Sequence, residues 1–160
     1  MNFLFKSAIW IGGFVSAVTL GAVFTSQYGY GLKPCVLCIY QRWPYAAAIA
    51  ISVLYLLLKD RINDVIARLG LALAFAATGG IAAFHVGVEQ KWWEGTSECT
   101  ADTGAGMTMD QLRDQLMSAP LVKCDEVAWE MFGISMAGYN LILAIVMCAF
   151  MLISVSHARK

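Results

Sequence analysis

The sequence predicts an all-α integral membrane protein, a bundle of four helices that each cross the bilayer. Of its 160 residues, 59% are hydrophobic and 14% are charged, whereas a soluble domain carries about 25% charged residues. The charges are clustered and leave four long segments without Asp, Glu, Lys or Arg. A spanning helix needs about 20 mostly apolar residues. We therefore expect a single membrane domain over residues 1–160, with spans near 8–25, 39–58, 69–88 and 134–155.

Each expected span has its own local signals. The first follows Lys6, and it is too long for a secretory signal core of about 7–15 residues, which favours a retained span. Pro44 lies in the second, so that helix kinks or begins there. In the third, Ala72 and Ala76 belong to a row of small residues four apart, which predicts a close packing face. Asn140, in the fourth, is interpreted as a hydrogen-bonding link between helices.

The short loops predict the orientation. Basic residues lie in a loop of about residues 59–68 and at both ends of the chain, so the positive-inside rule places these regions in the cytoplasm. The loops of about 26–38 and 89–133 then face outward. In the second of these, residues 108–111 look like a capping box and predict a short amphipathic helix on the membrane. The formal net charge is zero and gives no support for nucleic-acid binding.

Four of the five cysteines lie in the expected outer loops. Cys35 and Cys38 are at the outer end of the second span, and Cys99 and Cys124 are in the long loop. Cysteines on the non-cytoplasmic side, with none in the cytoplasmic loops, are typical of an oxidising compartment. Cys148 lies inside the fourth span among small side chains and is interpreted as an inert packing residue.

The spacing of the two pairs favours different roles. A disulfide that closes a loop of two intervening residues removes little chain entropy, so Cys35 and Cys38 favour catalysis over structural stapling. For Cys99 and Cys124, stapling and redox chemistry are equally compatible with an exported loop. A four-thiolate zinc site is a further reading, but the second pair lacks the close spacing of such sites, and we assign no metal.

Two ionisable residues are expected in the same outer layer. Arg42 follows Cys38 by one helical turn, so the two would share a face. There it could favour a thiolate or an anionic cofactor, or it could anchor the helix among lipid headgroups. His85 lies near the outer end of the third span, and ionisable groups at membrane depth are functional suspects. It could donate a hydrogen bond or pass a proton, and both residues are candidate cofactor ligands.

Taken together, these features carry a resemblance to a known family. Four spans, the Pro-Cys-x-x-Cys-x-Tyr-x-Arg run at 34–42 and a second cysteine pair in a long outer loop resemble the bacterial disulfide bond formation protein B (DsbB) family. The resemblance implies a thiol:quinone oxidoreductase of the bacterial inner membrane, which reoxidises a soluble periplasmic DsbA-like thiol oxidase. The quinone would be ubiquinone or menaquinone.

The resemblance also implies a role for each site residue. Cys99 would form the mixed disulfide with the soluble partner. Cys124 would attack or pair with Cys35, and Cys38 would face the quinone. Arg42 matches the quinone-side arginine of the family, and His85 is assigned to the same cofactor site.

The redox chemistry of thiols is compatible with electron transfer from protein thiols to a quinone. Thiol–disulfide exchange alone only moves a disulfide, so generating one needs a two-electron acceptor of higher potential, and a quinone can supply that chemistry. An alternative is a quinone-linked enzyme of the vitamin K epoxide reductase type, but those proteins tend to carry Cys-x-x-Cys on a late span. A non-enzymatic membrane scaffold with structural disulfides is the alternative from another class, and it would show no quinone-dependent thiol oxidation.

Overall fold

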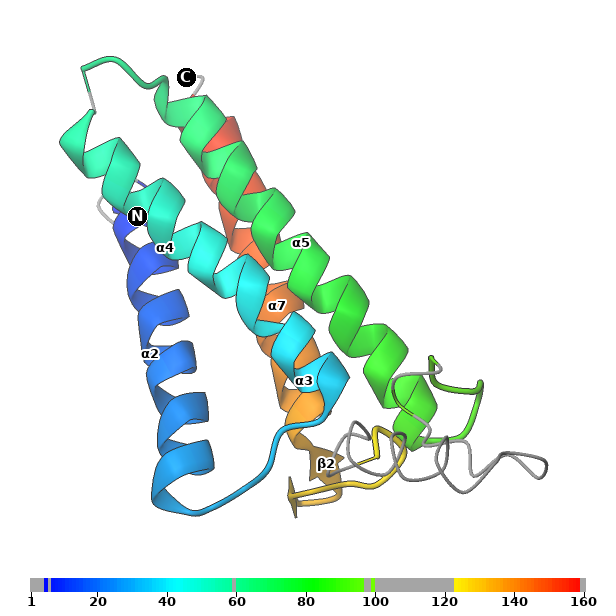
Figure 1. The fold of residues 1–160 in the computed structure, drawn as a ribbon. Coiled ribbons are helices and arrows are strands. Elements are labelled where there is room, and N and C mark those ends of the chain that lie inside the picture. Colours follow the sequence, from blue (N-terminus) through cyan, green and yellow to red (C-terminus); the bar gives the residue numbers. More distant parts are fainter. Residues whose placement is uncertain (1–4, 6, 59, 97–98, 100–122, 159–160) are drawn as a thin grey trace, which may run out of the picture.

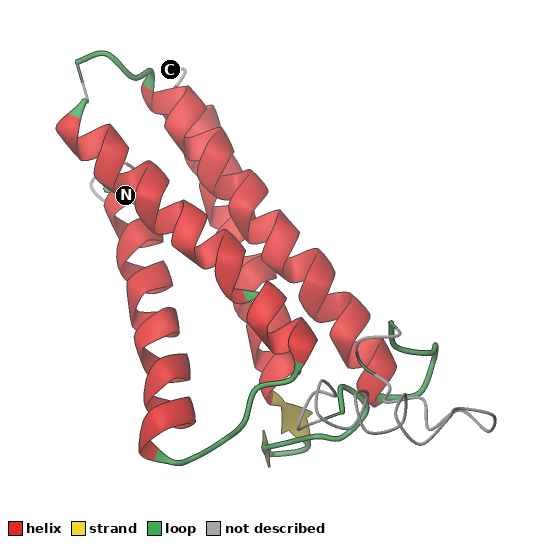
Figure 2. Cartoon of the chain, viewed as in Figure 1, coloured by secondary structure: helices red, strands yellow, loops and turns green. Residues whose placement is uncertain are grey.

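The computed structural model describes the chain except for residues 1–4, 6, 59, 97–98, 100–122 and 159–160. The described part is mostly helical, which confirms the predicted all-α membrane bundle (Figures 1 and 2). Its helices and strands are α2 (Ala8–Gly29), α3 (Val36–Tyr40), α4 (Arg42–Leu57), α5 (Asp64–Glu89), β1 (Glu130–Met131), β2 (Ile134–Ser135) and α7 (Met136–Ala158). The amphipathic helix expected after Thr108 lies outside the described residues.

Three described helices, α2, α5 and α7, are long and apolar enough to cross a membrane. The second expected span consists of two helices, α3 and α4, which are separated by a break at Gln41. By itself α4 has 16 residues. Pro44 lies in the first turn of α4, where its missing N–H breaks no helical hydrogen bond. The break places Gln41 and Arg42 just beyond the cysteine helix.

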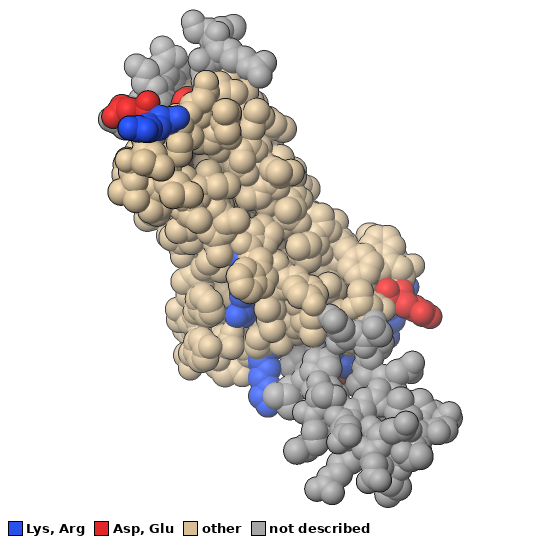
Figure 3. Space-filling model, turned by 45° about the horizontal axis from the view of Figure 1, so that its top comes forward, with Lys and Arg blue, Asp and Glu red and all other residues tan. Residues whose placement is uncertain are grey.

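The helices run side by side, and the two ends of the bundle differ (Figure 1). The start of α2, the α4–α5 connection and the end of α7 lie at one end. The short helix α3, the end of α5 and the β1–β2 hairpin lie at the other, which we call the hairpin end. Figure 3 shows a mostly uncharged face, with acidic and basic side chains toward both of its ends. Large apolar side chains such as Phe14 and Leu73 are exposed on the bundle, as a lipid-facing surface requires.

The packing face of α5 differs from the predicted row of small residues. Ala72 is buried, but Ala76 and Gly80 are exposed, so the row predicted from spacing four is wrong beyond its first member. The buried row follows alternating steps of four and three residues: Leu71, Phe75, Thr78, Ala82 and His85. Such steps average about 3.5 residues and stay on one face, whereas steps of four drift away from it. This row ends on His85.

Two glycines of α2 nevertheless allow this helix to pack closely against its neighbours. A Cβ atom on Gly13 of α2 would lie 2.6 Å from Cβ of Ser52 on α4, and one on Gly12 would lie 2.7 Å from Cε of Met151 on α7. These glycines let α2 approach both neighbours, as small residues do between membrane helices.

The β1–β2 hairpin, which the sequence analysis did not predict, lies at the hairpin end of the bundle. Phe132 and Gly133 both have positive φ, 53° and 75°, as a two-residue turn of type I′ requires. The following Ser135 accepts a hydrogen bond from the N–H of Gly138 over 3.1 Å and donates one to the carboxylate of Glu89 over 2.5 Å. The hairpin thereby joins the start of α7 to the end of α5.

Candidate active site

The two cysteines of the Cys-x-x-Cys motif meet at the start of α3. Cys35 is the N-cap residue, with extended backbone, and its sulfur accepts a hydrogen bond from the N–H of Cys38 over 3.3 Å. Neither forms a disulfide, and their Sγ atoms are 2.9 Å apart. A helix N-terminus stabilises a thiolate. The motif therefore presents the Cys35 sulfur to the positive end of a helix dipole.

The surroundings of Cys35, which precedes α3, also favour its ionised form. The hydrogen bond from the Cys38 side chain, and next that from His85, lower the pKa of the Cys35 thiol from 9.0 to about 4, although burial opposes this. Attacking thiols react as thiolates. Reduced Cys35 is therefore ionised at neutral pH and suited to nucleophilic attack or to leaving a disulfide.

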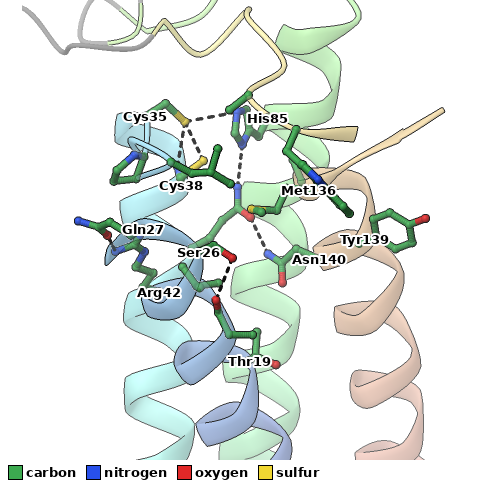
Figure 4. A pocket seen from close by; sticks show the side chains of 18 of the residues that line it. Thr19, Ser26, Gln27, Cys35, Cys38, Arg42, His85, Met136, Tyr139 and Asn140 are labelled. Atoms are coloured by element: carbon green, nitrogen blue, oxygen red, sulfur yellow. Dashed lines mark hydrogen bonds between the residues drawn. The ribbon is translucent and has the colours of Figure 1, made fainter. Parts of the chain in front are cut away.

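His85 lies beside the Cys35 sulfur (Figure 4). Its Nε2 is 3.5 Å from the Cys35 Sγ, and the backbone of Cys124 lies close to its imidazole. The side chain is buried. The sequence suggested a functional histidine at membrane depth, and the structure places it in contact with both thiol-bearing segments.

The second pair is present as a disulfide between Cys99 and Cys124. Both half-cystines are buried in one apolar cluster with Cys35, Leu37 and Val88. Residues far apart in the sequence thus bring four sulfur atoms to the hairpin end. The exposed fraction of Cys99 is 1%, so its sulfur is shielded from an outside thiol in this arrangement.

Arg42 lies on the far side of the motif, against α2. Its Nη1 donates to Oε1 of Gln27 over 2.7 Å, and its guanidinium carbon lies 5.3 Å from the centre of the Phe24 ring. Its Nε is buried and has no hydrogen-bond partner among the residues that the structure describes. The residue is half-buried against α2.

Side chains of the cysteine motif, Arg42 and His85 line one cavity of about 360 Å³. It lies among α2, the start of α4, α5 and α7, and apolar side chains from α2 and α7 form much of its wall. Figure 4 shows its polar corner. Five of the residues named in the sequence analysis line it: Cys35, Cys38, Arg42, His85 and Asn140. Such a mostly apolar cavity with a few convergent polar groups is typical of a small-molecule site.

Two cavity residues were missed by sequence reasoning. Glu89 is a buried carboxylate whose Oε1 lies 3.8 Å from the His85 Nε2. Its spacing of four from His85 on one helix was the available signal. Gln41 is buried, and its amide Nε2 lies 2.9 Å from the His85 Nδ1. Its position inside the cysteine motif gave no chemical reason to select it.

Asn140 has the linking role predicted for it. Its Nδ2 donates to Oε1 of Gln41 over 2.6 Å and to Oγ1 of Thr78 over 3.2 Å. The hydroxyl of Tyr45 donates to its Oδ1. Asn140 therefore joins α7 to α4, α5 and the helix break.

Cys35, Cys38 and His85 also offer three ligand atoms within 4.8 Å of one another, which a thiophilic cation could use. However, the Gln41 amide donates to the His85 Nδ1, which leaves the hydrogen of a neutral imidazole on Nε2. The nitrogen that faces the sulfur is then a donor. This arrangement favours stabilisation of a thiolate over ligation of a metal.

Comparisons with known proteins agree with this geometry. The model of the family described as disulfide bond formation protein DsbB matches residues 5–154. Disulfide bond formation protein B 2 of Pseudomonas aeruginosa is 31% identical, over 89% of this chain and 83% of its own length. Disulfide bond formation protein B of Methylobacillus flagellatus is 30% identical, over 92% and 91%.

The relatives also include an uncharacterized protein of Rickettsia prowazekii, which is 26% identical over 86% of this chain and 80% of its own length. No solved structure matches the chain.

Proposed function

The chain belongs to the DsbB family of disulfide bond formation proteins and is a disulfide-forming membrane oxidoreductase, and we propose that it passes electrons from a soluble thiol protein to a membrane quinone. The Cys99–Cys124 pair receives the electrons, and the Cys35–Cys38 pair delivers them. The observation that carries the proposal is the buried cluster that holds both pairs beside one cavity. An apolar cavity at membrane depth can admit a lipid-soluble acceptor, whereas a structural staple has no use for one.

The outer pair accepts electrons by thiol–disulfide exchange. A thiolate of the soluble partner attacks the Cys99 sulfur, which forms a mixed disulfide and releases Cys124 as a thiolate. A second partner thiolate then attacks its own half of the mixed disulfide and releases Cys99. The partner leaves oxidised, and Cys99 and Cys124 are reduced.

The inner pair then becomes reduced in two exchanges. The Cys124 thiolate attacks the Cys35 sulfur of the Cys35–Cys38 disulfide, and Cys38 leaves as a thiolate. The Cys99 thiolate next attacks the Cys124 sulfur, so the Cys99–Cys124 bond forms again and Cys35 leaves as a thiolate. The described arrangement, with Cys99–Cys124 bonded and Cys35 and Cys38 as free thiols, corresponds to the product of this step.

The residues around the cavity fit a quinone. Arg42 Nε is a buried donor without a partner in the described part of the chain, and a carbonyl oxygen in the cavity would satisfy it. The guanidinium would also stabilise negative charge that develops on that oxygen. When bound, the quinone accepts two electrons and two protons. Cys35 and Cys38 supply those electrons as they form their disulfide again, and the His85 Nε2, 3.5 Å from the Cys35 sulfur, is placed to stabilise the Cys35 thiolate.

The partner and the compartment follow from the same chemistry. We propose a soluble periplasmic DsbA-like thiol oxidase as the partner, because its dithiol must be accessible to the Cys99–Cys124 disulfide. The basic connection between α4 and α5 would face the cytoplasm, so the hairpin end would face the periplasm of a bacterial inner membrane. A disulfide donor is useful in that oxidising compartment.

An oxidation assay tests this function. It contains the purified protein, a reduced thioredoxin-like dithiol protein and added ubiquinone or menaquinone. We expect catalytic oxidation of the dithiol that depends on quinone, together with formation of quinol in equal amount. Without quinone, oxidation should stop after at most two dithiols per protein molecule, one for each disulfide. Cys148→Ala should keep near-normal activity and serves as the control, because Cys148 only packs against the core. Quinone-independent turnover, or no dithiol oxidation by folded protein, would rule out this function.

A further inference from the structure

Gln41 occupies the break between α3 and α4 and is buried, with an exposed fraction of 7%. Its backbone carbonyl accepts a hydrogen bond from the Thr78 hydroxyl over 3.1 Å. Its side-chain amide lies between His85 on α5 and Asn140 on α7. A buried polar side chain at the junction of three helices has a large effect on its neighbours, because each of its groups must be paired.

The Thr78 hydroxyl determines which atoms donate and which accept in the hydrogen bonds among Thr78, Asn140 and Gln41. Thr78 has a single hydroxyl hydrogen, and a carbonyl only accepts, so that hydrogen points to the Gln41 carbonyl. Toward Asn140, 3.2 Å away, the Thr78 oxygen can then only accept. The atom of Asn140 that faces Thr78 is therefore its amide nitrogen.

The same nitrogen of Asn140 lies 2.6 Å from the Gln41 side chain, and so the facing atom of Gln41 must be its oxygen. The Gln41 amide nitrogen is then left for Nδ1 of His85, at 2.9 Å. Because an amide nitrogen only donates, Nδ1 accepts, and a neutral imidazole carries its hydrogen on Nε2.

We propose that Gln41 is a positioning residue of the thiol centre, which holds His85 in the tautomer that directs Nε2–H at the Cys35 sulfur. In this arrangement the amide orients the imidazole, and the imidazole acts on the Cys35 thiolate as a hydrogen-bond donor. This inference deepens the proposed thiol exchange and rests on it for its functional meaning.

The tautomer matters at the step in which Cys35 leaves. The Cys99–Cys124 bond forms, the Cys35–Cys124 bond breaks, and the negative charge moves from the Cys99 sulfur to the Cys35 sulfur. Nε2–H stabilises that charge at a distance of 3.5 Å. In the opposite tautomer a nitrogen lone pair would face the thiolate, and the two would repel each other.

The charged groups around His85 agree with this assignment. On its own helix, the Glu89 carboxylate lies 3.8 Å from Nε2 and also requires a donor there. From α3, Cys38 contacts Cys35. Three further charged residues line the same cavity: Lys33, Arg42 and Glu126. On the Nδ1 side, within the described part of the chain, the hydrogen-bond partner is the neutral Gln41 amide.

Nitrogen NMR of the histidine ring tests the proposal without turnover. The chain has two histidines, so ¹⁵N-histidine labelling of full-length protein in nanodiscs, with His157→Gln for assignment, isolates the His85 signals. For the reduced wild-type protein we expect a protonated Nε2 and an unprotonated, hydrogen-bonded Nδ1. A wild-type spectrum with hydrogen on Nδ1 alone would overturn the proposal, whatever the variants do.

Two substitutions and a control separate positioning from a structural role. Gln41→Leu removes the donor, so Nδ1 should lose its hydrogen bond and the tautomer preference. Gln41→Glu presents only acceptors, so Nδ1 should become protonated. Gln27→Leu removes a different cavity glutamine, which bonds Arg42, and should leave the His85 tautomer unchanged. An unchanged His85 spectrum in folded Gln41→Leu would contradict the proposal.

The pH profile of Cys35 alkylation provides the functional readout. With iodoacetamide and peptide-level mass spectrometry, Gln41→Leu should move the midpoint of the profile to higher pH. At a pH below both midpoints, raising the midpoint by one pH unit slows alkylation about tenfold. If NMR shows the expected His85 tautomer but quinone-dependent oxidation is absent, the proposed function is wrong and the positioning role of Gln41 is retained. If quinone-dependent turnover is present but wild-type His85 carries its hydrogen on Nδ1, only the positioning role is wrong.

Discussion

The Arg42 guanidinium donates to the Gln27 side chain over 2.7 Å, and this contact directs the cation into the cavity from the side of α2. Arg42→Met keeps much of the stem and loses the charge, so we expect a raised KM for quinone and a smaller change in exchange between the cysteine pairs. Arg42→Lys keeps the charge but loses the planar fork and should be intermediate. Steady-state oxidation over a range of quinone concentrations measures the effect.

Gln27→Leu is the matched control for Arg42, because it frees the guanidinium without removing it. Its KM for quinone should lie between those of wild type and Arg42→Met. Normal quinone kinetics in folded Arg42→Met would show that Arg42 only supports the bundle, and other polar groups of the cavity, such as His85, would then hold the quinone.

The pH dependence of Cys35 follows from its lowered pKa of about 4. The thiolate fraction is complete at neutral pH and is lost as pH falls through about 4, whereas an ordinary thiol of pKa about 8.5 is largely protonated at pH 7. Alkylation of Cys35 in the reduced protein should therefore stay nearly constant from about pH 8 to pH 5. Cys38→Ala removes the strongest hydrogen bond to the sulfur and should move the midpoint upward. A wild-type midpoint above pH 7 would contradict this expectation.

The glycine contacts of α2 predict a contrast in stability. Gly13→Ala would place its Cβ 2.6 Å from Ser52 Cβ, and overpacking of this kind costs about 1–3 kcal/mol. Gly21→Ala has nothing within 4 Å of the added Cβ and should be neutral or stabilising, because alanine has the higher helix propensity. Thermal unfolding in detergent measures both. Equal melting temperatures for the two variants would mean that α2 and α4 are not closely packed at Gly13.

Labelling with a membrane-impermeant maleimide tests the orientation. Asp60 is exposed in the connection between α4 and α5, at the end of the bundle away from the hairpin (Figure 1). Asp60→Cys should react only after the cells are permeabilised, and Thr103→Cys should react in cells with an intact inner membrane. Reaction of both positions from the same side would disprove the four-span topology.

The bundle could be predicted from the sequence because charge-free segments and hydropathy report directly on the bilayer. The thiols and Arg42 could be selected because the Cys-x-x-Cys motif and the basic residue after it are close in the sequence. The packing face of α5 was predicted incorrectly at Ala76 and Gly80, since a single residue type at spacing four does not reveal the mean step of the buried row.

Gln41 and Ser135 could not be selected, and the reason is a different one. Their importance depends on contacts between helices that no spacing along one helix describes. Gln41 bonds His85 across 44 positions and Asn140 across 99, and Ser135 bonds Glu89 across 46. Polar networks of this kind are visible only once the helices are placed side by side.

The central claim is that electrons pass from Cys124 to Cys35, and disulfide trapping tests it most directly. In full-length protein carrying Cys38→Ser, Cys99→Ser and Cys148→Ala, mild oxidation should link Cys35 to Cys124, as identified by mass spectrometry of the joined peptides. The matched protein with Cys35→Ser in place of Cys38→Ser should form the Cys38–Cys124 link more slowly. Faster formation of Cys38–Cys124, or no link in either folded protein, would contradict the account.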